Sequence, residues 1–288
     1  MSDASLGGPL PEFIDLHTHS TASDGARKPA DVVRAARAAG LAALALTDHD
    51  TLSGIPEATA MGAELGIRII PGIELSAVDG DVETHVLGLH LSHAQEMEHR
   101  LVEIREMRVS RASRMVERLN ALGIPVAFDA VLAEAAGGAV GRPHVARAII
   151  AGGWCRDFRE AFERYLGNGK LAFVAKDSLP LADAIALIHR AGGIAVLAHP
   201  GGSAPRERVA LLVGQGLDGL EVLHPGHSWD ESQRLDALVS EFDLVRSGGS
   251  DWHGATDGSR SLGMMRVPHQ WLRAQEARAA TIGSRRVA

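Results

Sequence analysis

The stretch Phe13-Ile14-Asp15-Leu16-His17-Thr18-His19-Ser20 is a short apolar run that leads into two histidines. In an extended chain, residues two apart point to the same side, so His17 and His19 can aim both imidazoles at one cation. Asp24 follows five residues later, just before a glycine that can turn the chain, and adds a hard oxygen ligand. A lone His-x-His pair is equally typical of a polar loop, so the remaining sequence decides between the two interpretations.

The same unit of an apolar run followed by polar ligand-type side chains recurs along the chain. Apolar runs predict strands at residues 13–16, 41–47, 68–73, 82–91, 194–198, 217–223 and 244–249. Helical patterns with proline starts or glycine stops lie between several of them, at residues 29–39, 55–65 and 180–191. Loops after parallel strands of a (β/α) barrel converge on one face, so the sequence predicts an irregular α/β barrel.

Residues 95–171 break this rhythm. A long Arg- and Glu-rich helical stretch covers residues 94–122, and shorter helical patterns follow at 128–136, 142–151 and 157–166. Glycine-rich joints separate these patterns. We therefore expect a barrel formed by residues 1–94 and 172–288, with a helical insertion at 95–171 that contributes to substrate binding.

Composition restricts the class of partner. Hydrophobic residues make up 45% and charged residues 23% of the 288 residues, as in ordinary globular proteins. The net charge of −7 gives no electrostatic footprint for duplex DNA. No signal peptide or membrane-length apolar run is evident, and the single Cys155 fits a reducing compartment. We expect a cytoplasmic protein without a membrane, duplex-DNA or protein partner.

Imidazole and carboxylate side chains gather around the predicted strand ends. They are His17, His19, Asp24, His49, Glu74, His85, His199, Asp251 and His253. This set lacks thiolates, which favours Mn, Fe, Zn or Mg, and it is too large for one cation. Any one of these histidines could be an ordinary interior residue, but independent core histidines have no reason to fall at successive strand ends. The sequence therefore predicts two or three divalent ions, with Glu74 able to bridge two of them.

Several of these segments resemble the ordered motifs of the PHP (polymerase and histidinol phosphatase) phosphoesterases. They are Asp15-Leu16-His17-Thr18-His19-Ser20, Thr47-Asp48-His49-Asp50, Gly72-Ile73-Glu74, Thr84-His85-Val86, Ala198-His199-Pro200 and Ser250-Asp251-Trp252-His253. The resemblance spans nearly the whole chain and implies a distorted seven-stranded (β/α) barrel with a binuclear or trinuclear metal centre. Of the metals named above, we expect manganese.

The resemblance also implies which ligands each metal would take. The first metal would take His17, His19, Glu74 and Asp251; the second would take Glu74, His85 and His199; and the third would take Asp24, His49 and His253. Some members have a histidine as the first ligand of the third metal, where this chain has Asp24. That departure leaves occupancy of the third position open.

The insertion resembles one branch of this family. Gly141-Arg142-Pro143-His144, Tyr165-Leu166-Gly167-Asn168-Gly169-Lys170 and Val174-Ala175-Lys176 are similar to segments of enzymes that act on nucleoside 3′,5′-bisphosphates and trim short RNA from its 5′ end. Arg142 can grip a phosphate with its guanidinium, and Lys170 or Lys176 can add a point charge, although surface lysines are usually only solvated. His144 lies in the same motif. We expect these four residues to bind substrate.

The expected activity is hydrolysis of a phosphoric ester by metal hydroxide, which attacks phosphorus in line with the leaving group. His17, His19, Glu74 and Asp251 would form the catalytic centre, and His224 or His227 could protonate the leaving oxygen. Two alternatives remain: a histidinol-phosphate phosphatase, and a non-hydrolytic, metal-stabilised module that binds 5′-phosphorylated RNA. The native metal, the base preference, the main cellular substrate and the oligomeric state stay open.

Overall fold

The computed structural model describes residues 13–80, 82–175, 179–255 and 260–285. In this part of the chain the strands form one nine-stranded sheet. They are β1 (Phe13–Asp15), β2 (Ala43–Leu46), β3 (Arg68–Asp79), β4 (Val82–Leu89), β5 (Leu179–Pro180), β6 (Ile194–Leu197), β7 (Gly219–Leu223), β8 (Val245–Gly248) and β9 (Val267–Pro268).

The sheet curls into a nearly closed barrel. Its order is β8-β7-β6-β4-β3-β2-β1-β9, and β5 pairs with β3 outside this path. β1 and β8 lie at opposite edges of the seven longer strands, and the chain contacts between them close the barrel. The Leu16 N–H donates to the Gly248 carbonyl at 3.1 Å, and Thr18 bridges to Trp252. The predicted distorted α/β barrel is confirmed.

The β3–β4 hairpin departs from the prediction. β3 continues through Glu74 to Asp79, and β4 runs antiparallel to both β3 and β6. Glu74 therefore lies within β3, so the predicted strand end at residue 73 is wrong. His85 lies within β4, inside the predicted strand 82–91, but this strand is antiparallel, so the expectation that ligands follow parallel strands is wrong for it. The physical reason is the turn at Gly80 (φ +60°), which folds the chain back so that β3 and β4 pair along their length.

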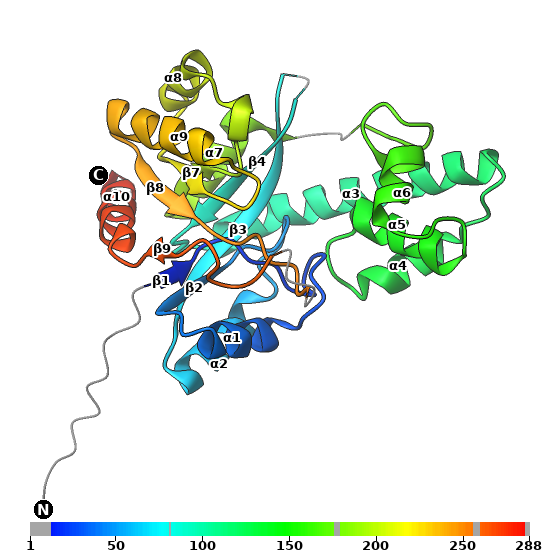
Figure 1. Ribbon diagram of the computed structural model, residues 1–288, viewed down its shortest axis with the longest axis horizontal. Coiled ribbons are helices and arrows are strands. Elements are labelled where there is room, and N and C mark those ends of the chain that lie inside the picture. Colours follow the sequence, from blue (N-terminus) through cyan, green and yellow to red (C-terminus); the bar gives the residue numbers. More distant parts are fainter. Residues whose placement is uncertain (1–12, 81, 176–178, 256–259, 286–288) are drawn as a thin grey trace, which may run out of the picture.

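Helices cover the outside of the barrel (Figure 1). They are α1 (Pro29–Ala38), α2 (Ile55–Leu65), α7 (Leu181–Arg190), α8 (Arg206–Gly214), α9 (Trp229–Glu241) and α10 (Trp271–Arg285), with a short 3₁₀ turn at Gly201–Ser203. The predicted helices at 29–39, 55–65 and 180–191 are confirmed to within one residue at each end. α8, α9 and α10 were not delimited from the sequence. A capping box between Ser228 and Glu231 starts α9.

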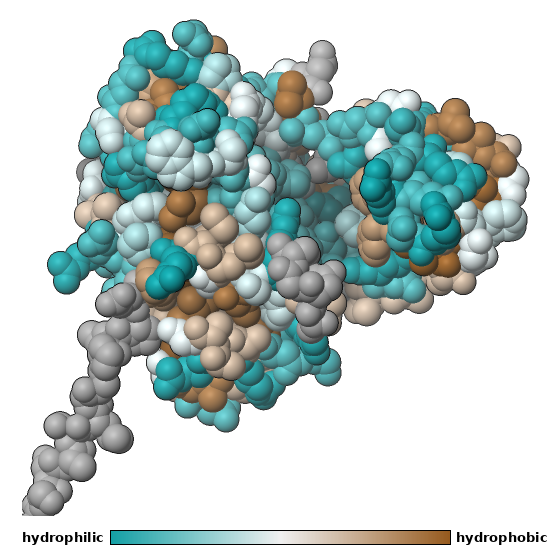
Figure 2. Space-filling model, viewed as in Figure 1, coloured by the Kyte–Doolittle hydropathy of each residue, from teal (hydrophilic) through white to brown (hydrophobic). Residues whose placement is uncertain are grey.

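The described residues between β4 and β5 form a helical lobe beside the barrel (Figure 1). It contains α3 (Gln95–Ala121), α4 (Phe128–Ala135), α5 (Arg142–Ala151), α6 (Phe158–Ala161) and a π-helical turn at Phe162–Leu166. α3 belongs to both parts. Its first half packs Met97, Leu101 and Ile104 into a barrel core, whereas its second half packs Met115 and Leu119 into the core of the lobe. Figure 2 shows a hollow between barrel and lobe, with mostly hydrophilic walls on this face.

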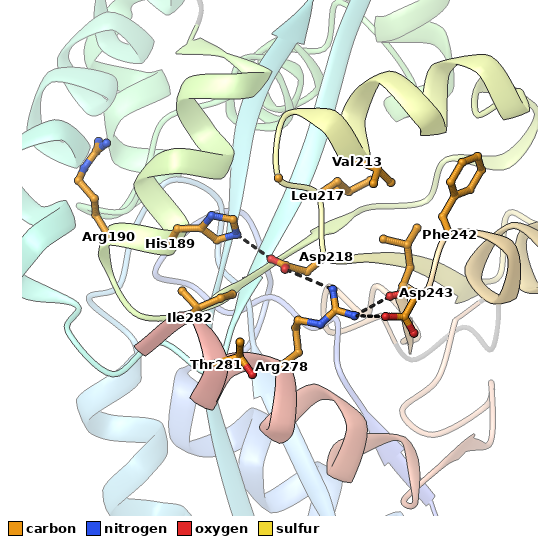
Figure 3. Close-up of a pocket in the computed structure, with 12 residues that line it drawn as sticks. His189, Arg190, Val213, Leu217, Asp218, Phe242, Asp243, Arg278, Thr281 and Ile282 are labelled. Carbon is orange, nitrogen blue, oxygen red and sulfur yellow. Dashed lines mark hydrogen bonds and ion pairs between the residues drawn. The ribbon is translucent and has the colours of Figure 1, made fainter. Parts of the chain in front are cut away.

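A pocket of about 610 Å³ lies at the end of the barrel where β7 and β8 begin. His189, Asp218 and Arg278 line it and form a chain of polar contacts (Figure 3). Asp218 accepts from the Ala195 N–H at 2.9 Å and lies 2.7 Å from His189 Nε2.

No helix in the described ranges combines the length and apolarity needed to cross a membrane.

Candidate metal centre

The turn that follows β1 is shaped by the buried carboxylate of Asp48. Asp48 accepts three hydrogen bonds of 2.7 Å, from the Ser20 N–H, the Ser20 hydroxyl and the Ser23 hydroxyl. These bonds fold the turn after β1, so the side chains of His17 and His19 are fully buried inside the barrel. Burial of polar groups is costly unless they find partners, so the surroundings of the two rings matter.

Glu74 lies at the middle of the cluster. Its Oε2 is 3.2 Å from His17 Nε2, 3.2 Å from His19 Nε2 and 3.1 Å from His49 Nδ1. Its Oε1 is 2.8 Å from His85 Nδ1 and 3.0 Å from His199 Nε2. One carboxylate therefore faces five imidazoles.

Two aspartates extend the cluster on either side of His19. Asp251 Oδ1 lies 3.2 Å from His19 Nε2 and 3.5 Å from His17 Nε2. Asp24 Oδ1 lies 3.3 Å from His253 Nε2 and 3.9 Å from His19 Nδ1, and Asp24 Oδ2 lies 4.0 Å from His49 Nε2. The two nitrogens of His19 thus face different carboxylates.

The nine side chains expected to bind metal are brought together. Within the described residues, three groups have ligand atoms within 4.8 Å of one another: His17, His19 and Asp251; His49, Glu74 and His85; and His19, Asp24, His49 and His253. The grouping differs from the expectation: Glu74 is absent from the first group, His49 takes the place of His199 in the second, and His19 joins the third. His199 still contacts Glu74 Oε1 as expected, at 3.0 Å.

Within the described residues, several buried ring nitrogens of this cluster make no hydrogen bond. They are His17 Nε2, both nitrogens of His19 and His49 Nδ1. Buried polar atoms in native proteins nearly always have a partner, and these atoms lie beside carboxylate oxygens without hydrogen-bond geometry. Imidazole nitrogens and carboxylate oxygens suit divalent transition metals, so the residues fit a metal centre.

The cluster is electrostatically coupled. Burial alone would raise the pKa of Glu74, but the imidazoles of His49, His85 and His17 hold that pKa well below its usual range. Burial opposes protonation of His19, yet Asp251 and Glu74 raise its pKa to about 10. For His49, burial dominates and lowers the pKa to about 3. The carboxylates of the cluster therefore favour positive charge beside them, as the carboxylates of a cation site do.

The two proton-donor candidates lie in different surroundings. His224 Nε2 is 3.4 Å from Asp251 Oδ2, and its Nδ1 accepts from the Gly226 N–H at 3.0 Å. His227 uses both nitrogens on the backbone: Nε2 accepts from the Gly201 N–H at 3.0 Å, and Nδ1 lies 3.1 Å from the Val222 carbonyl. Only His224 therefore faces the cluster directly.

The residues expected to bind substrate separate into two kinds. Arg142 lines a pocket of about 230 Å³ that also contains His85, His199 and Arg208. His144 is buried, its Nδ1 accepts from the Gly141 N–H at 3.0 Å, and burial lowers its pKa, so it caps the start of α5. Lys170 is exposed and its N–H closes a turn onto Gly167. Lys176 lies outside the described residues.

Several site residues in the described part of the chain were not predicted. Glu221 hydrogen-bonds His17, Glu83 lies 2.9 Å from Arg142, and Arg208 donates to Thr84 at 2.9 Å in the same pocket. Glu221 is a carboxylate near the end of the predicted strand 217–223, and that position could have identified it as a candidate site residue. Glu83 and Arg208 are ordinary charged residues in sequence, and only the fold brings them to the site.

The comparisons with known proteins agree with this geometry. The PHP domain family matches residues 15–228. The chain is 40% identical to a 5′-3′ exoribonuclease of Haemophilus influenzae, over 83% of this chain and 89% of that protein. It is 38% identical to a 3′,5′-nucleoside bisphosphate phosphatase of Chromobacterium violaceum, over 87% of this chain and 90% of that protein.

Solved structures give the same result. A Bifidobacterium adolescentis protein described as a metal-dependent phosphoesterase superposes with a TM-score of 0.86 at 33% identity, covering 94% of this chain and 98% of that one. The fold and site define a metal-dependent phosphoric ester hydrolase. The chain belongs to the PHP domain family, which confirms the resemblance noted in the sequence.

Proposed function

We propose that this protein hydrolyses the 3′-phosphate of nucleoside 3′,5′-bisphosphates, removes 5′ nucleotides from short 5′-phosphorylated RNA, or does both. The activities named for the Haemophilus influenzae and Chromobacterium violaceum relatives support this substrate class. The single cysteine is consistent with a cytoplasmic location.

The proposed metal ligands are the nine residues that converge around Glu74 and Asp24. His17, His19, Glu74 and Asp251 would hold one ion, Glu74, His85 and His199 a second, and Asp24, His49 and His253 a third. Manganese suits this mixture of imidazole and carboxylate, with Zn, Fe and Mg as alternatives. When bound, such ions neutralise phosphoryl oxygens and lower the pKa of water.

The observation that carries the substrate assignment is the pocket beside His85 and His199. Its volume is about 230 Å³, and two guanidinium groups line it: Arg142 from the helical lobe and Arg208 from the barrel. Arg142 donates to Asn168 and to Glu83, each at 2.9 Å, which uses two of its five N–H groups. A guanidinium binds phosphate through two parallel hydrogen bonds. The pocket can therefore hold one phosphate while a second phosphate of the same substrate reaches the cluster.

His224 is the favoured proton donor to the leaving sugar oxygen. Its Nδ1 accepts a backbone N–H, so the proton of the neutral ring sits on Nε2, which faces Asp251. His227 is less suited to this role because both of its nitrogens contact the backbone.

The test is a parallel assay of released phosphate and nucleotide with Mn²⁺ present. The substrates are adenosine 3′,5′-bisphosphate, a 5′-phosphorylated oligoribonucleotide and histidinol phosphate. We expect turnover of one or both of the first two and none of the third. Turnover of histidinol phosphate alone would refute the substrate assignment, and tight RNA binding without product would instead indicate a binding module.

A further inference from the structure

Glu221 is a buried carboxylate that lies behind the histidine cluster. It belongs to β7 and is 0% exposed. Its Oε1 lies 3.0 Å from His17 Nδ1, and its Oε2 accepts the His199 N–H at 2.6 Å. Within the described residues, Glu221 is in none of the three groups whose ligand atoms converge. It therefore contacts two candidate ligands without being one.

The contact with Glu221 determines which nitrogen of His17 carries the proton when the ring is neutral. A neutral imidazole has one N–H and one lone pair, and an ionised carboxylate can only accept. The N–H therefore sits at Nδ1, beside Glu221. The lone pair sits at Nε2, 3.2 Å from Glu74 Oε2 and 3.5 Å from Asp251 Oδ1. This tautomer directs the metal-binding nitrogen into the cluster.

The second oxygen of Glu221 acts on the backbone of His199. This residue has φ +31°, a left-handed conformation that a histidine adopts only where its surroundings hold it. Glu221 Oε2 binds its N–H, and the imidazole then lies with Nε2 3.0 Å from Glu74 Oε1. The same carboxylate thus serves one ligand through its ring and another through its main chain.

We infer that Glu221 is a positioning residue of the metal centre, which fixes the His17 tautomer and the His199 backbone so that both imidazoles face Glu74. Outer partners of this kind hold ligand rings in place, and their loss typically weakens metal affinity by about 10- to 100-fold. The inference rests on the proposed function only in that the cluster must bind divalent cations, and it does not depend on the substrate.

The test compares Mn²⁺ affinity of full-length variants by competition with a chelating dye. In E221Q the side chain keeps its shape, but an amide has only one oxygen and cannot accept from both His17 Nδ1 and the His199 N–H. We expect roughly 10- to 100-fold weaker Mn²⁺ binding. E221D keeps two accepting oxygens on a shorter side chain and should fall between E221Q and wild type.

Glu231 provides the matched control. It is a glutamate ten positions further along the chain that caps α9 through Ser228 and contacts none of the nine candidate ligands in the described structure. E231Q should bind Mn²⁺ like wild type even though a helix cap is weakened. If E231Q and E221Q lost affinity equally, general destabilisation would explain the effect and the inference would be overturned.

A second measurement does not depend on how well E221Q folds. In wild-type protein labelled with ¹⁵N-histidine and loaded with Zn²⁺, the His17 signal should show the proton on Nδ1 and the metal on Nε2. A proton on Nε2 would overturn the inference, as would E221Q affinity within twofold of wild type. Wild type that binds Mn²⁺ but hydrolyses none of the substrates would refute the proposed function alone.

Discussion

Histidines lie beside buried carboxylates at both ends of the barrel: at the amino end, where β7 and β8 begin, and at the carboxyl end, where the histidine cluster lies. In the described part of the chain, the ring nitrogens named below are hydrogen-bonded to a carboxylate at the amino end and not at the carboxyl end. At the amino end, His189 Nε2 lies 2.7 Å from Asp218 and forms a hydrogen bond, and Asp218 also accepts from the Ala195 N–H. At the carboxyl end, His17 Nε2 and His19 Nε2 each lie 3.2 Å from Glu74, and neither nitrogen has a hydrogen-bond partner among the described residues. Histidine and carboxylate together therefore do not mark a functional site.

The unmet hydrogen bonds are what distinguish the carboxyl end. A folded protein can tolerate such groups when a ligand completes them, and divalent cations are the ligands that suit this donor set. The amino end needs no ligand to satisfy the polar groups just described, which fits the general pattern that barrel enzymes keep chemistry at the carboxyl end and stability at the other. Substitutions at the two ends should consequently separate activity from stability.

Glu74→Gln should give the largest effect. The change removes the charge that faces five imidazoles, so bound metal should fall and phosphatase activity should drop on the order of 10²–10³-fold. Metal content by elemental analysis and phosphate release at saturating substrate measure both effects. Unchanged metal content would show that Glu74 does not bridge the ions and would weaken the contrast between the two ends.

Arg142→Ala tests the pocket beside the cluster. We expect KM to rise roughly 10- to 100-fold because a charge-assisted phosphate contact is lost, while metal content stays at the wild-type value. Arg190→Ala is the matched control, since Arg190 is an exposed arginine at the amino-end pocket. Loss of metal in R142A, or an equal rise of KM in R190A, would contradict a phosphate contact by Arg142.

The sequence predicted local structure best where a residue has an intrinsic backbone preference. The helix at Ile55–Leu65 ends at Gly66 in the left-handed conformation, and the helix at Arg142–Ala151 begins with Pro143 in its first turn, so both predicted ranges match the structure. The candidate metal ligands could also be recognised from the sequence, because imidazoles and carboxylates recur at the predicted strands and their motifs follow the order of those of the PHP family.

Long-range partners could not be predicted in the same way. His17 and Glu221 are 204 residues apart, and nothing local to either one indicates the contact. The antiparallel course of β4 was missed because an alternating apolar pattern specifies a strand and not its direction. Arg208 and Glu83 likewise become site residues only after the barrel closes.

Asp218→Ala should reverse the outcome of the Glu74 change. Asp218 is buried, and its loss leaves the Ala195 N–H and His189 without their acceptor, so stability should fall by about 2 kcal/mol. Activity of the folded, metal-loaded protein should stay within twofold of wild type. Urea unfolding and phosphate release on the same samples measure the two quantities, and a large loss of activity at unchanged stability would mean that the amino end communicates with the site.

Arg278→Ala should give the smallest effect of the series. Arg278 Nη1 lies 3.9 Å from Asp218 Oδ1, and Arg278 Nη2 donates to the Asp243 main-chain carbonyl at 2.5 Å and lies 3.4 Å from Asp243 Oδ2. The Asp243 side chain is fully exposed, so water screens much of the attraction between the charges. Asp218 keeps its His189 and Ala195 contacts without the arginine, and the Tm should therefore remain within about 2 °C of wild type. A Tm loss as large as that of D218A would show that the whole polar chain at the amino end acts as one unit. A small loss would show that the stabilising effect of this polar chain comes mainly from the buried pair of Asp218 and His189. The corresponding pair at the carboxyl end, Glu74 and His17 Nε2, forms no hydrogen bond among the described residues.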